Sequence, residues 1–152
     1  MSTGGMKSLE RTGSAMQALA DPVVLVARAL MAYLFIVEGY GKIGGYSSVA
    51  GYMQDHGVPS ILLPIVILTE LGGGLLILTG LATRGAAIAL AGYAILTALF
   101  FHTSADQTVE FQKNLVIAGG FLVLAAYGPG ASSLDGWLAR ARRRGASRPE
   151  QI

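Results

Sequence analysis

The sequence predicts an all-α membrane protein: a transmembrane four-helix bundle with a short amphipathic C-terminal interfacial helix. Two observations predict this fold class. First, 53% of the 152 residues are hydrophobic and only 13% are charged, with a mean hydropathy of +0.56. A soluble domain carries about 25% charged residues, so this chain has too little charge to cover a globule in water. Second, the apolar residues fall into four segments. An ordinary soluble enzyme and a largely disordered chain are therefore excluded.

The first predicted span follows a polar N-terminal segment. Residues 1–20 are small and polar, and we expect them to form a flexible cytoplasmic tail. Asp21 and Pro22 predict the start of the helix, with the aspartate as its cap and the proline in its first turn. The apolar residues 23–43 are long enough to cross a hydrocarbon core of about 30 Å. A cleaved signal peptide fits poorly, because this run contains charges and no small-residue cleavage site follows it.

Three further segments complete the predicted bundle. A Gly/Ser/Tyr loop over residues 44–58, which could include a short surface helix, leads to an apolar run over residues 59–81. Residues 85–102 form a third run without charge, and a polar loop separates it from the fourth run, residues 111–128. The fourth is the weakest span, but the Arg-rich C-terminus would lie on the wrong side if it did not cross. We therefore assign residues 21–136 to one four-span membrane domain.

The chain after the fourth span is predicted to lie at the membrane surface as an amphipathic helix. Ser132 and Asp135 form an S-x-x-D capping pattern before it. Its apolar face is Leu134, Trp137, Leu138 and Ala141, and its basic residues are Arg140, Arg142, Arg143 and Arg144. We expect the tryptophan to lie at the headgroups and the arginines to pair with anionic membrane lipids. The run is short and lacks aromatic stacking partners, so we expect no nucleic-acid binding. Residues 137–152 form the basic cytoplasmic tail.

The basic residues predict the orientation of the chain. Eight of the eleven Lys and Arg residues lie outside the spans and on one side: Lys7, Arg11, Arg84, Arg140, Arg142, Arg143, Arg144 and Arg148. The loops on the other side contain acidic residues and no Lys or Arg. By the positive-inside rule, both termini are cytoplasmic.

Charged and polar side chains inside the spans form the candidate site. Charge at mid-bilayer costs several kcal/mol, so such residues normally face protein or water. At 100° per residue, Arg28, Glu38 and Lys42 fall on one stripe of the first span. The candidate ligand-binding residues of a shared polar pocket are Arg28, Glu38, Lys42, Glu70, His102, Lys113 and Asn114.

Two interpretations of these residues remain open. They could be internal ion pairs that fix the register of the helices, because three positive and two negative charges nearly balance. They could instead line a pocket, open to the outer side, that holds a quinone head group. Lys113, Asn114 or His102 would then donate to the quinone oxygens, and Glu38 or Glu70 could pass protons.

Other cofactor sites have little support in the sequence. Cysteine is absent, which excludes disulfides, thiol chemistry and Cys-ligated iron–sulfur or zinc sites. Only two histidines occur, so bis-His haem is not expected, and no flavin site is evident. His102 and Asp106, with His56 and Glu110, are better explained as a solvated loop than as a metal site.

Several short motifs occur in order along residues 22–136. They are Arg28, Glu38-Gly39-x-Gly41-Lys42, Glu70-x-Gly-Gly-x-Leu, Thr83-Arg84, Gln112-Lys113-Asn114 and Gly128-Pro129-Gly130-x-x-Ser133-Leu134-Asp135. Together they resemble the DoxX family of small four-helix bacterial inner-membrane proteins. The resemblance implies a place in the bacterial cytoplasmic membrane and a role in a membrane-associated oxidoreductase assembly. It assigns no catalytic residue.

The resemblance and the polar stripe together predict the function. We expect an integral membrane subunit of a quinone-linked oxidoreductase system, which binds a quinone or docks a redox partner protein. The alternatives are a small transporter or proton pathway, and a non-catalytic membrane scaffold. A homo-oligomer is plausible, because four short helices expose many small residues.

Overall fold

The four-span fold is confirmed. The computed structural model describes the backbone of residues 3–146 and the side chains of residues 19–144. The regular elements of this range are all helical, and four helical segments are long and apolar enough to cross a membrane. They are Leu19–Gly44, Ser60–Thr79, Thr83–Phe101 and Ala105–Tyr127.

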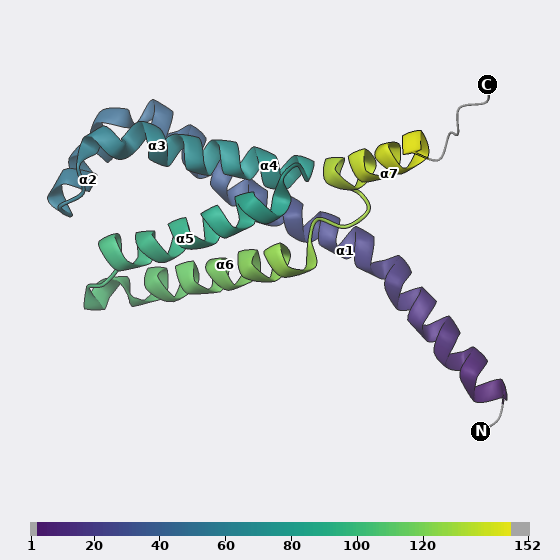
Figure 1. Cartoon of the computed structure of the whole chain (residues 1–152). Helices are drawn as coiled ribbons and strands as arrows, with labels where there is room; N and C mark the ends of the chain where they lie inside the picture. The colour runs from purple at the N-terminus through teal and green to yellow at the C-terminus, as the bar shows by residue number, and fades with distance from the viewer. Residues whose placement is uncertain (1–2, 147–152) are drawn as a thin grey trace.

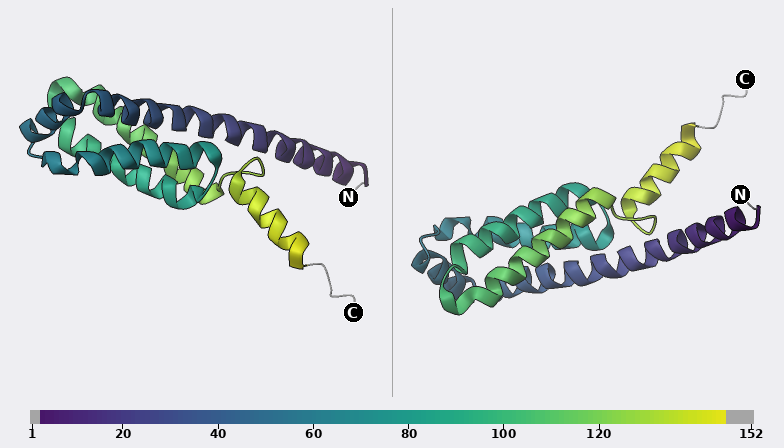
Figure 2. Two further views of the ribbon diagram at one scale, coloured as in Figure 1. Left: turned by 90° about the horizontal axis from the view of Figure 1, so that it is seen from above. Right: turned by 90° about the horizontal axis from the view of Figure 1, so that it is seen from below.

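Helix α1 (Thr3–Gly44) is longer than the sequence predicts. It runs through Pro22 without a break, so the predicted start at Asp21 is wrong. The Asp21 carboxylate instead accepts a 2.8 Å hydrogen bond from the backbone N–H of Ala131, in the loop after the last span. Figures 1 and 2 show α1 extending well beyond the other helices. The side chains of Lys7 and Arg11 lie outside the described residues.

The second span changes its helical winding along its length. It follows the short helix α2 (Tyr46–Asp55) and is built from η1 (Ser60–Leu62), α3 (Leu63–Ile67), the π-helical turn η2 (Leu68–Gly72) and α4 (Gly73–Thr79). A π turn inserts one extra residue and is frequent at functional sites. Here it carries Glu70, which is 4% exposed.

Two pairs of helices make up the bundle. Helices α5 (Thr83–Phe101) and α6 (Thr108–Tyr127), joined through η3 (Ala105–Gln107), pack side by side, and α1 packs along the second span. The buried face of α5 is rich in alanine, which allows close approach of its neighbours. The core cluster comprises Ala32, Phe35, Ile77, Ala86, Ala87, Leu90, Ala91, Ala94, Ala118, Phe121 and Leu124.

Glycines let α1 approach the backbone of the second span. A Cβ on Gly74 would lie 2.9 Å from Ile36 Cγ1 and 3.2 Å from the Ile36 nitrogen. A Cβ on Gly39 would lie 2.8 Å from the Leu71 nitrogen. No side chain fits at these two positions, so close packing of the two helices requires glycine there.

Arg28 fastens the end of the bundle from which α7 emerges, which we name the α7 end. Its guanidinium is 1% exposed and donates to four backbone carbonyl oxygens. Two belong to Ile77 (2.9 Å) and Leu78 (2.7 Å) in α4, and two to Pro129 and Ser132 (2.9 Å each) in the loop after α6. Arg28 therefore joins three parts of the chain through carbonyl groups that would otherwise lack donors.

Helix α7 (Leu134–Ala146) forms in the stretch of sequence where a helix is predicted, but its capping differs from the prediction. Ser133, not Ser132, is the cap: its Oγ accepts from the N–H of Gly136 at 3.0 Å. Asp135 instead accepts from the N–H groups of Ala82 (3.0 Å) and Thr83 (3.1 Å), and so caps α5. The apolar residues Leu134, Trp137 and Leu138 are exposed on α7. Arg148 and the rest of 147–152 lie outside the described residues.

Removal of the Arg28 guanidinium should strongly destabilise the bundle. Arg28→Met leaves carbonyl oxygens of two segments without donors, and we expect a loss of about 3 kcal/mol or more in the free energy of unfolding. Thermal unfolding in detergent measures it. Arg142→Met, at an exposed position on α7, should leave the transition unchanged. A small loss of stability in Arg28→Met would show that water can replace the guanidinium as the donor to these carbonyl oxygens.

Gly80 should not tolerate a side chain. It adopts a φ of +72°, and a Cβ would lie 2.5 Å from both Arg28 Nη2 and Ser133 Cβ. Gly80→Ala should therefore cost more than the roughly 1 kcal/mol of backbone strain alone. Gly85→Ala is the matched control, because a Cβ there meets nothing within 4 Å. Equal melting temperatures for the two variants would contradict the close approach.

Candidate functional site

A cavity of about 340 Å³ lies at the opposite end of the bundle, beside α2, which we name the α2 end. Its apolar wall is formed by Leu34, Phe35, Val49, Tyr52, Met53, Val58, Val66, Phe101 and Ile117. Its polar wall is formed by Glu38, Lys42, Glu70, Tyr93, Thr97, His102, Glu110, Lys113 and Asn114. All four spans and α2 contribute, so the cavity is a product of the whole bundle.

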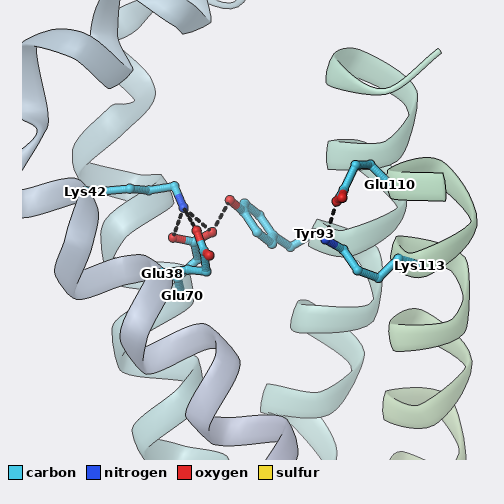
Figure 3. Close-up of polar contacts among 6 residues, drawn as sticks. All are labelled: Glu38, Lys42, Glu70, Tyr93, Glu110 and Lys113. Atoms are coloured by element: carbon cyan, nitrogen blue, oxygen red, sulfur yellow. Dashed lines mark hydrogen bonds and ion pairs between the residues drawn. The ribbon is translucent and has the colours of Figure 1, made fainter. Parts of the chain in front are cut away.

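A buried carboxylate forms the centre of one polar wall. Lys42 Nζ lies 2.8 Å from Glu70 Oε2 and donates a hydrogen bond to Oε1 at 3.0 Å. It also contacts Glu38 Oε2 at 3.3 Å. The hydroxyl of Tyr93 donates to Glu70 Oε1 at 2.6 Å (Figure 3). Glu70 is thus held by one ammonium and one phenol from two different helices.

The local fold of α1 and the second span explains this contact. A Cβ on Gly39 would lie 3.1 Å from Glu70 Cβ, so only glycine lets α1 approach the acid so closely. The π turn at Leu68–Gly72 then sets the direction of the Glu70 side chain locally. One turn along α1 from Glu38, Lys42 reaches the carboxylate.

A second ion pair lies on α6, across the cavity. Lys113 contacts Glu110 one turn earlier, and both side chains are about half exposed (53% and 42%). Asn114 donates its amide to the Glu110 carbonyl at 3.0 Å. His102 Nδ1 lies 3.2 Å from Gln107 Oε1. Figure 3 shows Tyr93 reaching from α5 toward the first ion cluster, while the Glu110–Lys113 pair stands apart from it.

Aromatic rings close the cavity beside α2. Tyr52 stacks on Phe101 with ring centres 5.5 Å apart, and His56 contacts both rings. His56 is therefore part of an aromatic cluster. In the described part of the chain, no three His, Cys, Asp or Glu residues are arranged to hold a metal ion.

Between the cavity and the α7 end, apolar side chains fill the bundle. Phe35 packs edge-on against Phe121 at 5.3 Å and against Tyr93 at 6.2 Å between ring centres. Phe121 is fully buried. The polar groups of the cavity are thereby separated from the Arg28 network at the α7 end.

The structure brings six of the seven predicted site residues to one cavity: Glu38, Lys42, Glu70, His102, Lys113 and Asn114. Arg28 does not line it. The helical-wheel argument grouped Arg28 with Glu38 because both share a stripe of α1, but they lie almost three turns apart along the helix. Arg28 is instead occupied by carbonyl groups.

Sequence reasoning did not include Tyr93 among the site residues. A hydroxyl-bearing ring in the middle of an uncharged span was the available signal, since a buried Tyr O–H usually finds a partner. The contribution of α2 was also missed, because nothing in residues 46–55 marks a wall of a cavity.

Comparisons with known proteins agree on one family. A family model described as DoxX matches residues 23–103. Inner membrane protein YqjF of Escherichia coli (strain K12) is 53% identical over 123 residues, covering 79% of this chain and 95% of that protein. Inner membrane protein YphA of the same strain is 37% identical over 127 residues (76% and 91%).

A third relative is more distant. CatD of Bacillus subtilis (strain 168), provisionally named an oxidoreductase, is 33% identical over 60 residues, covering 40% of this chain and 45% of that protein. No solved structure matches the chain.

The two partners of Lys42 should differ in their importance for stability. Lys42→Met leaves the buried Glu70 without its counter-charge, and we expect a loss of about 3–5 kcal/mol. Glu38→Gln removes a partner whose side chain is 57% exposed, so its cost should stay below about 1 kcal/mol. Thermal unfolding of these two variants, of Glu70→Gln and of the double variant Lys42→Met/Glu70→Gln measures the coupling between Lys42 and Glu70. The double variant should recover much of the loss; strict additivity would contradict the buried pair.

Proposed function

The chain belongs to the DoxX family of membrane proteins, and from that premise we propose that it is a subunit of a quinone-linked oxidoreductase system. The pocket at the α2 end would hold the quinone head group. One observation carries the proposal: a cavity with charged and hydrogen-bonding walls lies beside the apolar core cluster of the bundle. Its volume of about 340 Å³ is at the lower end of the range for ligand pockets, about 300–1,000 Å³.

The chemistry of the walls suits a quinone. A quinone head is flat, uncharged and bears carbonyl oxygens that accept hydrogen bonds. Lys113, Asn114 and His102 offer donors on one side of the pocket, and Lys42 offers donors on the other, where the Tyr93 hydroxyl already donates to Glu70. Apolar and aromatic residues between the two walls would pack against the ring.

The buried acid supports proton exchange with such a ligand. Reduction of a quinone to a quinol takes up two electrons and two protons. Tyr93, Glu70 and Lys42 form a continuous hydrogen-bonded group that could carry protons to a bound head group. The electrons would come from a redox partner protein docked on the chain or from a second quinol. The oxidoreductase name of CatD supports this setting.

The alternatives have less support. A proton or solute pathway needs polar groups across the whole bundle, but Phe35 and Phe121 pack beneath the pocket and Arg28 is occupied by carbonyl groups. A pure scaffold needs ion pairs but no cavity beside them. Binding of a ligand at one end explains both the charges and the space.

We also infer that the α2 end faces outward and that both termini are cytoplasmic. Arg84, Arg140 and Arg142 lie toward the α7 end, and the relatives YqjF and YphA are named inner membrane proteins. The cysteine-free chain allows a direct measurement. In intact cells, a membrane-impermeant maleimide should label Asp106→Cys and leave Arg142→Cys unlabelled until the cells are opened. Labelling of Arg142→Cys but not of Asp106→Cys in intact cells would show that the α7 end faces outward.

Quinone binding tests the function itself. The protein, purified gently in detergent, should retain quinone in its extracted lipids and should bind an added benzoquinone. Asn114→Leu should weaken that binding about tenfold, because a donor to the ligand is lost. Gln112→Leu is the matched control: Gln112 is an exposed amide on the same helix and does not line the pocket. Absence of quinone from the lipids, together with no binding of the added benzoquinone, would refute the proposal.

A further inference from the structure

The pocket reaches the surface of the bundle between α1 and α6, along a line that we name the α1–α6 seam. It is bounded by Leu34 and Glu38 on α1 and by Lys113 and Ile117 on α6, and all four line the pocket. We propose that the pocket is loaded sideways from the bilayer through this seam, by an amphiphile with an uncharged head and a hydrocarbon tail. The identity of the head group rests on the function proposed above; the route and the tail are new.

The packing of the helices singles out this seam. Helices α5 and α6 pack along their length, as do α1 and the second span, and α4 packs on α5. Helices α1 and α6 meet farther from the α2 end, where Phe35 packs on Phe121 and Met31 lies against Gly120. Nearer the α2 end, pocket-lining residues on both helices are substantially exposed.

The exposed fractions show that several residues that line the pocket at the seam also lie on the outer surface of the bundle. Leu34 is 36% exposed, and the side chains of Glu38 and Lys113 are 57% and 53% exposed. By contrast, Glu70, on the wall opposite α6, is 4% exposed. Residues that line an enclosed wall should be as buried as Glu70, so the pocket is open at the seam. Tyr52 also lines the pocket and is 45% exposed, but it lies on α2, outside the four spans, so the seam is the opening that lies along the spans.

The order of residues along the seam matches an amphiphile. Glu38 and Lys113 lie toward the α2 end, while Leu34 and Ile117 lie about one turn deeper in the spans. The surface beside the deeper part is apolar: Leu30 is 68% exposed and Val116 75% exposed. A head group would therefore lie among polar side chains, and its tail would leave past Leu34 into hydrocarbon.

The charges of the pocket argue against an anionic head. Both ammonium groups are already matched, Lys42 by Glu38 and Glu70, and Lys113 by Glu110. Three carboxylates thus face two ammoniums. A phosphate head would add negative charge where the surroundings are poorly polarisable, and repulsion there is strong. A phospholipid is therefore disfavoured as the occupant.

The absence of cysteine permits a test that closes the seam. In the variant Leu34→Cys/Ile117→Cys, a bis-maleimide would bridge α1 and α6. The probes are two benzoquinones, one with a long alkyl tail and one without, added to protein in lipid nanodiscs. Bridging before addition should weaken binding of the tailed probe about tenfold or more and spare the tailless probe. Bridging after loading should slow release of the tailed probe.

Matched controls separate the seam from general damage. Each single-cysteine variant, treated with the same reagent, carries the modification without the bridge. The bridged double variant should bind the tailed probe more weakly than either treated single variant, and this difference measures closure of the seam. Leu34→Trp obstructs the seam without a bridge and should reproduce the loss for the tailed probe. Leu30→Trp changes the same residue type one turn away, outside the pocket, and should not.

Three results would overturn the inference or a part of it, and they can be told apart. If the parent binds both probes but neither the bridge nor Leu34→Trp affects the tailed one, the seam is not the route and the proposed function stands. If the parent binds neither probe, the proposed function fails and the inference fails with it. Competition by an anionic phospholipid as strong as that by the tailed probe would refute the uncharged head.

Discussion

A carboxylate inside a lipid-embedded bundle must have a partner, and the contact between Glu70 and Lys42 meets that requirement. An unpaired charge at this depth is costly, so the fold has to bring an ammonium to Glu70. Gly39 gives α1 the necessary approach, and the π turn of the second span presents the acid. Tyr93 then completes the group from α5. The position of three helices at the α2 end is thus tied to one acidic side chain.

The two ends of the bundle are held by opposite means. At the α7 end, Arg28 meets only neutral carbonyl oxygens, and the surrounding loops fit tightly around it. At the α2 end, charges pair with charges and leave a cavity between them. Buried ion pairs stabilise less well than apolar packing of the same volume. Their concentration around a cavity supports a role in recognition, whereas the Arg28 network needs only a structural explanation.

The sequence alone predicted the spans and most of the candidate site, for a simple reason. Bilayer thickness fixes the length of an apolar helix, and charge within such a helix is rare enough to mark the interior. What the sequence could not predict depends on contacts between distant segments. Asp21 and Asp135 look like local caps, yet both serve loops more than fifty residues away. Arg28 lies on the same face of α1 as Glu38 but does not line the pocket. A helical wheel shows the face on which a residue lies and not its position along the helix axis. The π turn has no sequence marker beyond the acid it carries.

Asp135 has a consequence for communication along the molecule. This single carboxylate sits in the first turn of α7 and holds the leading amide groups of α5. Ten residues further on, α5 bears Tyr93, about 15 Å away along a rigid rod. If α7 were displaced from the bundle, the N–H groups of Ala82 and Thr83 would lose Asp135 as their acceptor. The N-terminus of α5, the helix that carries Tyr93, would then be less stable. Helix α7 and the polar wall of the pocket therefore both contact the same helix, α5.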